Sequence, residues 1–219
     1  TFTSKIADNR LIAEFPAPYW NFYEWRKGLS GLIDNELDRF EVITEERYDL
    51  PLNAFVSDAF FCYEKICDML NRKCSAKIKS ARGKISVALN EMFWDDDDKA
   101  YLTSTDSPDK HTLTQALMLY IDAVPEERKK SVTEHIVNRD FIPASLAASV
   151  YLFDSLIKNG VSKEYVWKEI KRIWGGLIAK GAETFWETEI GADDFQKAGS
   201  LCHGWSAVPV YILGKYYSE

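Results

Sequence analysis

Long apolar runs are absent from this sequence of 219 residues. No stretch approaches the ~18 apolar residues that a membrane-spanning helix needs, and the mean hydropathy of −0.27 also argues against a membrane protein. A signal-peptide pattern is missing as well, and the chain begins at Thr1 rather than at a methionine. We expect a soluble protein whose N-terminus has been processed or cut, and the compartment stays open.

Positive charge is in short supply. Lys and Arg number 27 against 34 Asp and Glu, which gives a net charge of −7. Nucleic-acid binding depends on clustered Lys and Arg facing phosphate groups. The only basic run, at residues 77–84, alternates with apolar positions. The sequence therefore predicts no nucleic-acid partner.

Cysteine is scarce, and its spacing does not suit zinc. The four cysteines include no C-x-x-C pair, and the only histidine close to one of them is His203, beside Cys202. The run WDDDDK at residues 94–99 lacks the glycine and the spaced acids of a calcium loop. We expect reduced, buried thiols, a solvated acidic turn and no bound metal.

Helical periodicity, in contrast, is abundant. Apolar residues recur at i, i+3, i+4 and i+7 over most of the chain after residue 50, with turn residues between the periodic segments. Short connections make consecutive helices antiparallel neighbours. A brief β-like element is expected at Tyr101–Thr103. The pattern predicts a single all-α domain of about seven helices, at residues 51–72, 78–93, 113–121, 126–137, 146–157 and 166–177 and after Gly199.

The first 50 residues are aromatic and irregular instead. The segment WNFYEW, at residues 20–25, alternates aromatic rings with an amide and a carboxylate. Aromatic side chains usually fill a core, because they offer the largest apolar surfaces. The same alternation suits a sugar pocket, in which rings cover C–H faces and polar groups hold hydroxyls. Both interpretations stay open.

Residues 181–195, GAETFWETEIGADDF, contain five carboxylates. Glu187 differs from the others because it is flanked by Phe185 and Trp186. Large aromatic neighbours desolvate a carboxyl group, and desolvation raises its pKa toward the range that acid and base catalysis uses. Glu187 is therefore the candidate catalytic group. The carboxylates that we expect to be solvated are Glu183, Glu189, Asp193 and Asp194.

The three histidines differ in their surroundings. His111 and His135 have no partners at a useful spacing, and a surface position or a satisfied core position accounts for both. His203 lies in SLCHGWSAVPVYIL, which is predicted to open a helix whose first turn carries His203 and Trp205. A site shared with Glu187 is one interpretation. The other is a helix that packs its N-terminus beneath an acidic loop.

The residues from 181 to 213 resemble a known family. GAETFWETEIGADDFQKAGSLCHGWSAVPVYIL is similar to the C-terminal signature of family 78 glycoside hydrolases, the inverting α-L-rhamnosidases, in which G-A-x-T-x-W-E precedes S-L-x-H-G-W-S-A. WNFYEW resembles the aromatic W-x-F-x-D/E-W segment of that family, and TLTQALMLYIDAVPEE resembles its barrel helices. The resemblance covers nearly the whole chain, and the 181–209 segment is its specific part.

The resemblance implies an (α/α)6 toroid, built from six helical hairpins around a central cavity. A closed toroid needs two helices for each hairpin, and this chain supplies about seven in total. The general acid of the family belongs to an acidic D-G-x-x-R-E-R-like segment, and no such segment precedes WNFYEW. We therefore expect residues 1–219 to be the C-terminal part of one catalytic domain, about half of the barrel, and to be inactive alone.

The resemblance also implies roles for individual residues. Glu187 matches the general base that activates water, and His203 matches a histidine that lines the sugar pocket. Trp20 and Trp25 match the aromatic segment that borders the sugar, and Glu24 stands where an acid could hold a hydroxyl, although the family more often has Asp there. The expected sugar-contacting residues are His203, Trp25, Trp20, Glu24, Trp186 and Trp205.

The function implied is release of terminal L-rhamnose from glycosides or polysaccharides by single displacement with water. No cofactor or metal is expected, because two carboxyl groups and water suffice. The expected macromolecular partner is the remainder of the catalytic domain or a second chain, in the bacterial cytoplasm or periplasm. The alternatives are another (α/α)6 glycosidase with a different sugar, or a carbohydrate-binding fragment without catalysis.

Overall fold

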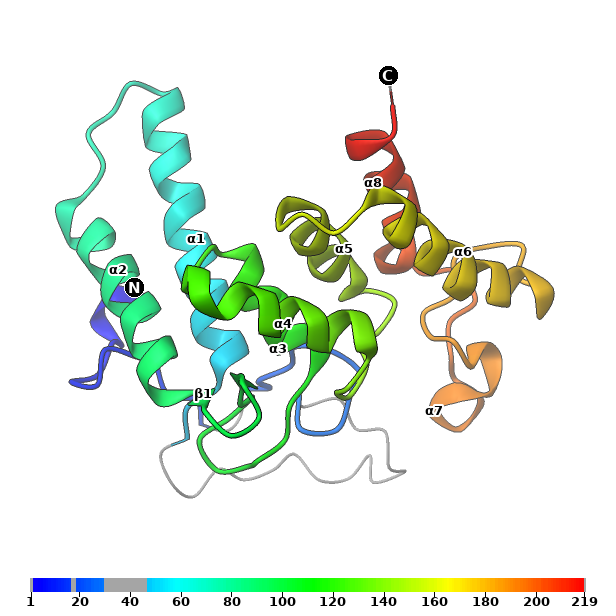
Figure 1. Cartoon of the computed structure of the whole chain (residues 1–219), viewed down its shortest axis with the longest axis horizontal. Helices are drawn as coiled ribbons and strands as arrows, with labels where there is room; N and C mark the ends of the chain where they lie inside the picture. The colour runs from blue at the N-terminus through cyan, green and yellow to red at the C-terminus, as the bar shows by residue number, and fades with distance from the viewer. Residues whose placement is uncertain (1, 17–18, 30–46, 219) are drawn as a thin grey trace.

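The computed structural model describes residues 2–16, 19–29 and 47–218 (Figure 1). Within these ranges the chain is mostly helical, as predicted. None of the helices there combines the length and the apolar character that crossing a membrane would need. The α-helices are α1 (Leu50–Met69), α2 (Ala76–Met92), α3 (Thr112–Tyr120), α4 (Glu126–Asn138), α5 (Ser149–Lys158), α6 (Lys163–Ala179), α7 (Asp194–Lys197) and α8 (Val208–Tyr216).

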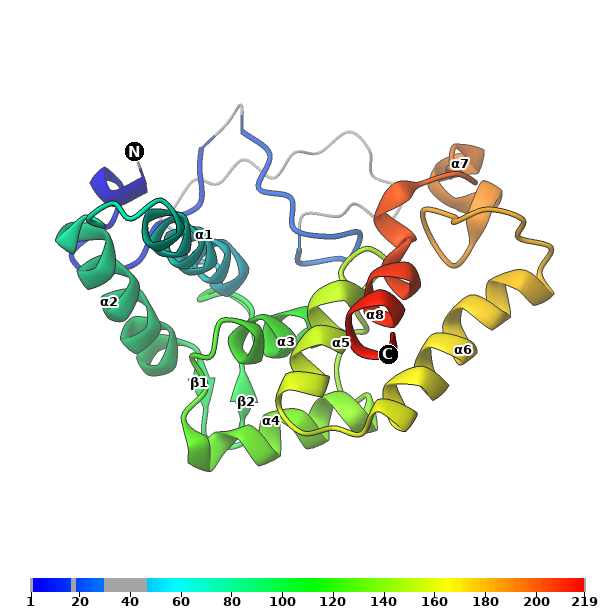
Figure 2. The same cartoon turned by 90° about the horizontal axis from the view of Figure 1, so that it is seen from above.

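The longer helices form an inner and an outer row. In the inner row, α3 packs against α1 on one side and α5 on the other, and α5 also contacts α8. In the outer row, α2, α4 and α6 each pack against the inner helix that precedes them in the chain. Figure 2 shows the resulting arc, whose concave side faces the N-terminal segment. Paired inner and outer helices are the layout of an α/α toroid, so the predicted fold class is confirmed.

Helix α3 is central because its side chains can be buried on every face. All residues from Thr112 to Leu119 are buried. The amide of Gln115 accepts a hydrogen bond from Tyr101 N at 2.9 Å and donates one to Tyr101 O at 2.7 Å. A buried amide whose hydrogen bonds are made costs little stability. Gln115 thereby fixes the neighbouring β-hairpin on α3.

The acidic run forms the turn of that hairpin. Strand β1 (Trp94–Asp95) pairs antiparallel with β2 (Ala100–Tyr101). Lys110 Nζ lies 2.8 Å from Asp95 Oδ2 and 2.7 Å from Asp98 Oδ2, at the edge of the turn. The solvated turn is confirmed, and the strand expected at Tyr101–Thr103 begins one residue earlier. The sequence pattern does not predict β1, because aspartate is uncommon in strands.

The cysteines correct one expectation. All four are free thiols. Cys67 and Cys74 are buried as predicted, but Cys62 and Cys202 are exposed, so the prediction of buried thiols is wrong for these two. Cys62 lies on α1 away from the core face that carries Cys67, and Cys202 lies in the loop before α8.

The histidines outside the candidate site divide between the two expected environments. His111 is fully buried, with Nδ1 2.8 Å from Thr103 Oγ1 and Nε2 2.8 Å from Lys27 O. Burial lowers the pKa of His111 below its usual value of 6.5. His135 lies near the surface, where its Nδ1 is 2.7 Å from Asp140 Oδ2. His111 is a satisfied core residue and His135 is a surface residue.

One asparagine of α1 attaches the N-terminal segment to the helices, and a second asparagine pairs within the segment itself. The buried amide of Asn53, on α1, accepts a hydrogen bond from Ile12 N at 2.8 Å and donates one to Ile12 O at 2.9 Å. Asn21 pairs in the same way with Phe15, at 3.0 Å and 2.8 Å. The segment therefore lies against the arc without forming a strand or a long helix in its described part.

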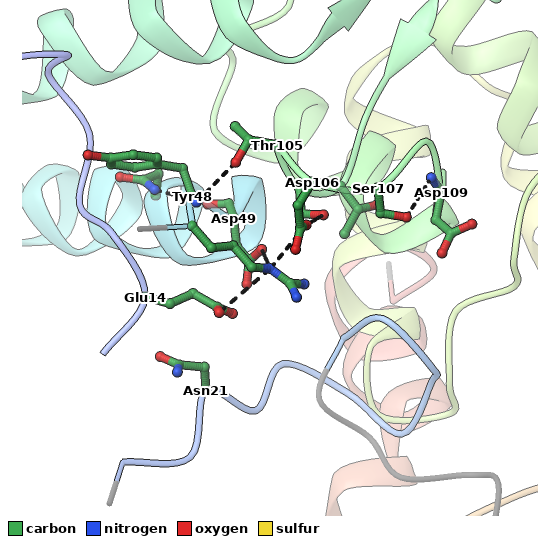
Figure 3. A network of polar contacts seen from close by, with 12 residues as sticks. Glu14, Asn21, Tyr48, Asp49, Thr105, Asp106, Ser107 and Asp109 are labelled. Carbon is green, nitrogen blue, oxygen red and sulfur yellow. Dashed lines mark hydrogen bonds and ion pairs between the residues drawn. The ribbon is translucent and has the colours of Figure 1, made fainter. Parts of the chain in front are cut away.

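A cluster of ionisable side chains, in which Glu14 and Asp49 are buried and Asp106 is exposed, adds a second attachment. Figure 3 shows Glu14 of the N-terminal segment facing Asp49, with Asp106 nearby. Arg47 Nε lies 3.0 Å from Asp49 Oδ1, 3.4 Å from Asp106 Oδ1 and 3.6 Å from Glu14 Oε2. Burial raises the pKa of Glu14 to about 9, and the adjacent Asp49 adds to the rise. The rise in pKa favours the protonated form of the Glu14 carboxyl group.

Candidate functional site

Two segments of the C-terminal region run side by side through backbone hydrogen bonds. Glu187 N donates to Ser200 O at 2.9 Å, and His203 N donates to Phe185 O at 2.7 Å. Ser200 N in turn donates to the side chain of Glu187, at 3.2 Å from Oε2. The pairing fixes the direction in which the carboxylate of Glu187 points.

This pairing brings the two central candidate residues together. Glu187 Oε1 lies 3.7 Å from His203 Nε2, which is within ion-pair range and longer than a hydrogen bond. The side chains are 14% and 25% exposed, respectively. His203 Nδ1 is buried and has no hydrogen-bond partner in the part of the chain that the structure describes. The sequence left open whether Glu187 and His203 meet. In the structure they are adjacent.

The helix expected at His203 begins later than predicted. His203 precedes a short 3-10 turn, Gly204–Ser206, and α8 starts only at Val208. Ser206 Oγ lies 2.5 Å from Trp186 O and 2.9 Å from His203 O, so its hydroxyl hydrogen bonds back toward the site. These bonds hold the chain in a tight turn, and the prediction that His203 and Trp205 lie on the first helical turn is wrong.

Two glycines allow the segments to approach each other. Gly191 has φ +78°, and a Cβ atom there would lie 2.6 Å from Cε3 of Trp186. A Cβ atom at Gly199 would lie 2.0 Å from Gly191 O. No real side chain tolerates such distances, so both positions need glycine. The ring of Trp186 therefore packs on the backbone of the loop beyond Glu187.

Three of the other four carboxylates of the acidic run are solvated as expected, and Asp194 is not fully solvated. Glu183, Glu189 and Asp193 are exposed, and Asp194 is half-buried, with Oδ1 accepting a hydrogen bond from Phe195 N at 2.9 Å. Among the five carboxylates, Glu187 has the histidine neighbour.

The aromatic N-terminal segment reaches this region. The rings of Trp20 and Phe22 lie 6.0 Å and 4.7 Å from the ring of Trp25, measured between centroids. On its other side, Trp25 contacts Phe195 with centroids 4.7 Å apart. Phe195 lies in the short α7, where its backbone is left-handed rather than helical (φ 49°), within the loop between Glu187 and Ser200. Segments far apart in the sequence therefore share one aromatic cluster.

A cleft of about 470 Å³ opens beside this cluster. Phe22, Glu24 and Trp25 of the aromatic segment line one part of it. Ser145 and Tyr151, before and in α5, line another part, and Trp205 completes it. Its wall is mainly aromatic and apolar, which is typical of a site that binds a small organic ligand.

The predicted site residues occupy different places relative to the cleft. Glu24, Trp25 and Trp205 line it. His203 lies next to the cleft, because its ring contacts the ring of Trp205 edge to face, with the centroids 4.9 Å apart. His203 also contacts Glu187, so it connects Glu187 with the cleft. Trp205 is 58% exposed and Trp20 is 48% exposed, with Trp20 outside the cleft lining. Trp186 lies behind Glu187, against Gly191.

Glu24 is the most deeply buried of these residues, with 2% of its surface exposed. Its Oε2 accepts a hydrogen bond from Ser145 N at 2.6 Å, and its Oε1 has no partner among the described residues. Burial raises the pKa of the Glu24 carboxyl group above its usual value, against the opposing effect of the Ser145 hydrogen bond. A neutral carboxyl group is therefore favoured.

Sequence reasoning did not single out the α5 side of the cleft. Tyr151 meets Phe55 at 5.4 Å and Tyr120 at 5.2 Å between ring centroids. Phe55 of α1 also lines the cleft, and Tyr120 packs behind Tyr151 outside the lining. The signal in the sequence is that Tyr151 falls outside the apolar stripe of its predicted helix, which is formed by Leu146, Val150, Phe153 and Ile157. Within the described ranges, no group of His, Cys, Asp and Glu is placed to hold a metal ion.

Comparison with known families gives one match that covers most of the chain. The model of the bacterial alpha-L-rhamnosidase 6 hairpin glycosidase domain matches residues 32–216. No curated protein matches the sequence.

Several solved structures are similar in fold. A family 78 rhamnosidase from Bacillus sp. GL1 has 20% identity and a TM-score of 0.75, over 98% of this chain and 22% of that chain. A Klebsiella oxytoca rhamnosidase with rhamnose bound has 15% identity and a TM-score of 0.70, over 99% and 40%. A Streptomyces avermitilis α-L-rhamnosidase complexed with L-rhamnose has 14% identity and a TM-score of 0.63, over 97% and 19%. The chain thus spans less than half the length of each of these proteins.

Proposed function

Because the chain belongs to the family of bacterial α-L-rhamnosidase six-hairpin glycosidase domains, we propose that it forms the part of an inverting α-L-rhamnosidase that holds the sugar and activates water. The observation that carries the proposal is the placement of Glu187 beside His203, next to an aromatic cleft. Two of the similar structures contain rhamnose, which supports terminal L-rhamnose as the sugar.

In this proposal Glu187 is the general base. An inverting glycosidase uses one carboxylate to remove a proton from water while a second carboxyl group protonates the leaving oxygen. Glu187 is partly exposed, and the hydrogen bond from Ser200 N to Oε2 leaves Oε1 available to a water molecule. His203 contributes a polar group that can hold a sugar hydroxyl beside that water.

The aromatic residues hold the sugar. Trp25 and Trp205 present ring surfaces in the cleft, and such surfaces pack against the C–H faces of a pyranose. Rhamnose is a 6-deoxy sugar, and its methyl group adds apolar surface that suits an aromatic wall. Glu24 and Ser145 supply polar groups in the same cleft.

The second carboxyl group is proposed to come from outside residues 1–219. Inversion needs the two groups roughly 6.5–9.5 Å apart. Glu24 is the single carboxylate among the described residues that line the cleft, and it is buried and bonded to Ser145. The similar structures are also more than twice as long as this chain. The chain is therefore expected to bind rhamnose without hydrolysing rhamnosides, and to act together with the rest of a toroid or a second chain.

Calorimetric titration with L-rhamnose and D-glucose tests the sugar, and incubation with an aryl α-L-rhamnoside and an aryl α-glucoside tests the chemistry. We expect binding of L-rhamnose and no hydrolysis by the chain alone. Preference for glucose would refute the choice of sugar. Hydrolysis by the chain alone that is abolished by Glu187→Gln would refute the external general acid.

A sugar-binding role without catalysis is the second candidate. It is favoured by the position of Glu187, which lies beside the cleft rather than in its described lining. The two candidates differ in a longer enzyme that contains this region. Glu187→Gln abolishes hydrolysis if Glu187 is the base, and leaves hydrolysis intact if the cleft only binds.

A further inference from the structure

Trp25 is held in the cleft through both of its chain neighbours. Glu24 Oε2 accepts a hydrogen bond from Ser145 N at 2.6 Å. Arg26 Nε donates a hydrogen bond to Pro143 O at 2.8 Å. The residues before and after Trp25 are therefore attached to one short stretch of chain, which leads into α5 and supplies the facing wall of the cleft.

The position of Trp25 matters because its ring joins two parts of the site. It contacts Phe22 on one side and Phe195 on the other, each at 4.7 Å between centroids. Phe195 belongs to the loop whose ends are paired at Glu187 and Ser200. A shift of Trp25 would alter both the sugar wall and the packing of the loop that carries the base.

Trp25 does not lie in a helix or a strand, so a few hydrogen bonds of neighbouring residues determine its position. Residues 19–29 contain neither a helix nor a strand. Beyond Glu24 and Arg26, the segment is anchored by the contact of His111 Nε2 with Lys27 O and by the fully buried Leu29, both after Arg26. Asn21 pairs with Phe15, four residues before Trp25. The bonds of Glu24 and Arg26 are the ones that act directly beside the Trp25 ring.

Burial raises the pKa of the Glu24 carboxyl group, and its hydrogen bonds with Ser145 act against that rise. The side chain receives one hydrogen bond from a backbone N–H, and its other oxygen has no partner among the described residues. Arg26 is the nearby charge, but its guanidinium is directed to backbone carbonyls. The titratable neighbours in the cleft are the phenols of Tyr23 and Tyr151, whose pKa values are raised by burial. An ionised carboxylate in such a position is costly.

We infer that Glu24 and Arg26 form a clamp that positions Trp25 for sugar binding, with Glu24 accepting a hydrogen bond from Ser145 N and Arg26 donating one to Pro143 O. The inference rests on the proposed function, because it takes the ligand of the cleft to be a sugar. Glu24 is then a positioning residue. The amide of glutamine can replace it, since a glutamine oxygen can accept the same bond from Ser145 N.

The decisive comparison is between Glu24→Gln and Glu24→Leu. At neutral pH, Glu24→Gln is expected to bind L-rhamnose like the original chain, and Glu24→Leu to bind on the order of tenfold more weakly, because Ser145 N loses its acceptor. Equal loss in both variants would overturn the inference. Arg26→Ala removes the other arm of the clamp and should also weaken binding.

One measurement needs no sugar and separates this inference from the proposed function. Hydrogen exchange at the Ser145 amide should be slow in the original chain and in Glu24→Gln, and fast in Glu24→Leu. Slow exchange at that amide in Glu24→Leu refutes the inference. Rhamnose that fails to bind while the exchange result holds refutes the proposed function alone.

Discussion

The carboxylate of Glu187 and the imidazole of His203 face each other at 3.7 Å, although they belong to different segments of an irregular region. The backbone pairing of Glu187 with Ser200 and of His203 with Phe185 produces this relationship. The pairing leaves both side chains partly exposed beside the aromatic cleft. The two residues should therefore contribute to ligand binding more than to stability.

His203→Ala is the first test of that view. It removes one polar partner of a bound sugar, and we expect L-rhamnose to bind roughly tenfold to a hundredfold more weakly, as for the loss of about 1.4–2.8 kcal/mol. The melting temperature should stay nearly unchanged. His135→Ala is the matched control, because His135 lies near the surface with Asp140 as its partner. Equal binding by His203→Ala and the original chain would remove His203 from the site.

Gly191→Ala should destabilise the protein. The new Cβ atom would lie 2.6 Å from the Trp186 ring, and the φ of +78° disfavours alanine. Together these effects should lower the free energy of unfolding by about 2–4 kcal/mol, measured by urea denaturation. Gly214→Ala is the control, because Gly214 lies within α8 and a Cβ atom there would meet no neighbour within 4 Å. This change should stabilise by about 0.5–1 kcal/mol.

The buried His111 should make stability depend on pH in the acidic range. Its pKa is lowered in the folded chain, so the folded state binds a proton less readily than the unfolded state does. Its contribution to stability is present above the unfolded value of 6.5 and is lost as the pH falls through the lower folded value. Urea denaturation at neutral and acidic pH measures the loss. His111→Gln should reduce it and His135→Gln should leave it in place.

Glu14 should make the protein less stable as the pH rises, which is opposite to the effect of His111. Its pKa is raised from 4.5 to about 9, so the folded state holds a proton that the unfolded state releases. The stability it contributes is complete below pH 4.5, declines as the pH rises, and is lost once the pH passes about 9. Glu14→Gln should therefore flatten the alkaline loss of stability. Glu183→Gln changes an exposed carboxylate and should leave the alkaline loss of stability in place. If Glu14→Gln loses stability at alkaline pH just as the original chain does, this account is wrong.

The sequence predicts the helices well because their signal is local. The spacing of apolar residues in α1, α2, α4 and α6 depends only on which face is buried, and each observed helix lies within a few residues of its prediction. The turn at Gly204–Ser206 has no such signal. It depends on the hydroxyl of Ser206 reaching Trp186 O, a contact between distant segments.

The candidate site could be predicted in part, because some of its residues also carry a local signal in the sequence. Glu187 stands out in the sequence because aromatic residues flank it, and the family resemblance adds His203. The cleft itself depends on Tyr151 and Ser145 meeting the aromatic segment, and no spacing in the sequence encodes that meeting. The exposure of Cys62 was missed because a thiol pattern does not reveal which face of a helix turns to solvent.

The loop closed by the Glu187–Ser200 pair has a consequence for protein engineering. Its ends are fixed by backbone hydrogen bonds and by the close contact of Gly191 with Gly199, so its tip can change without moving the carboxylate. Phe195 is the residue of the tip that touches the cleft wall, through Trp25. Libraries that vary the tip around Phe195 would thus reshape the entrance to the cleft while Glu187 and His203 stay in register.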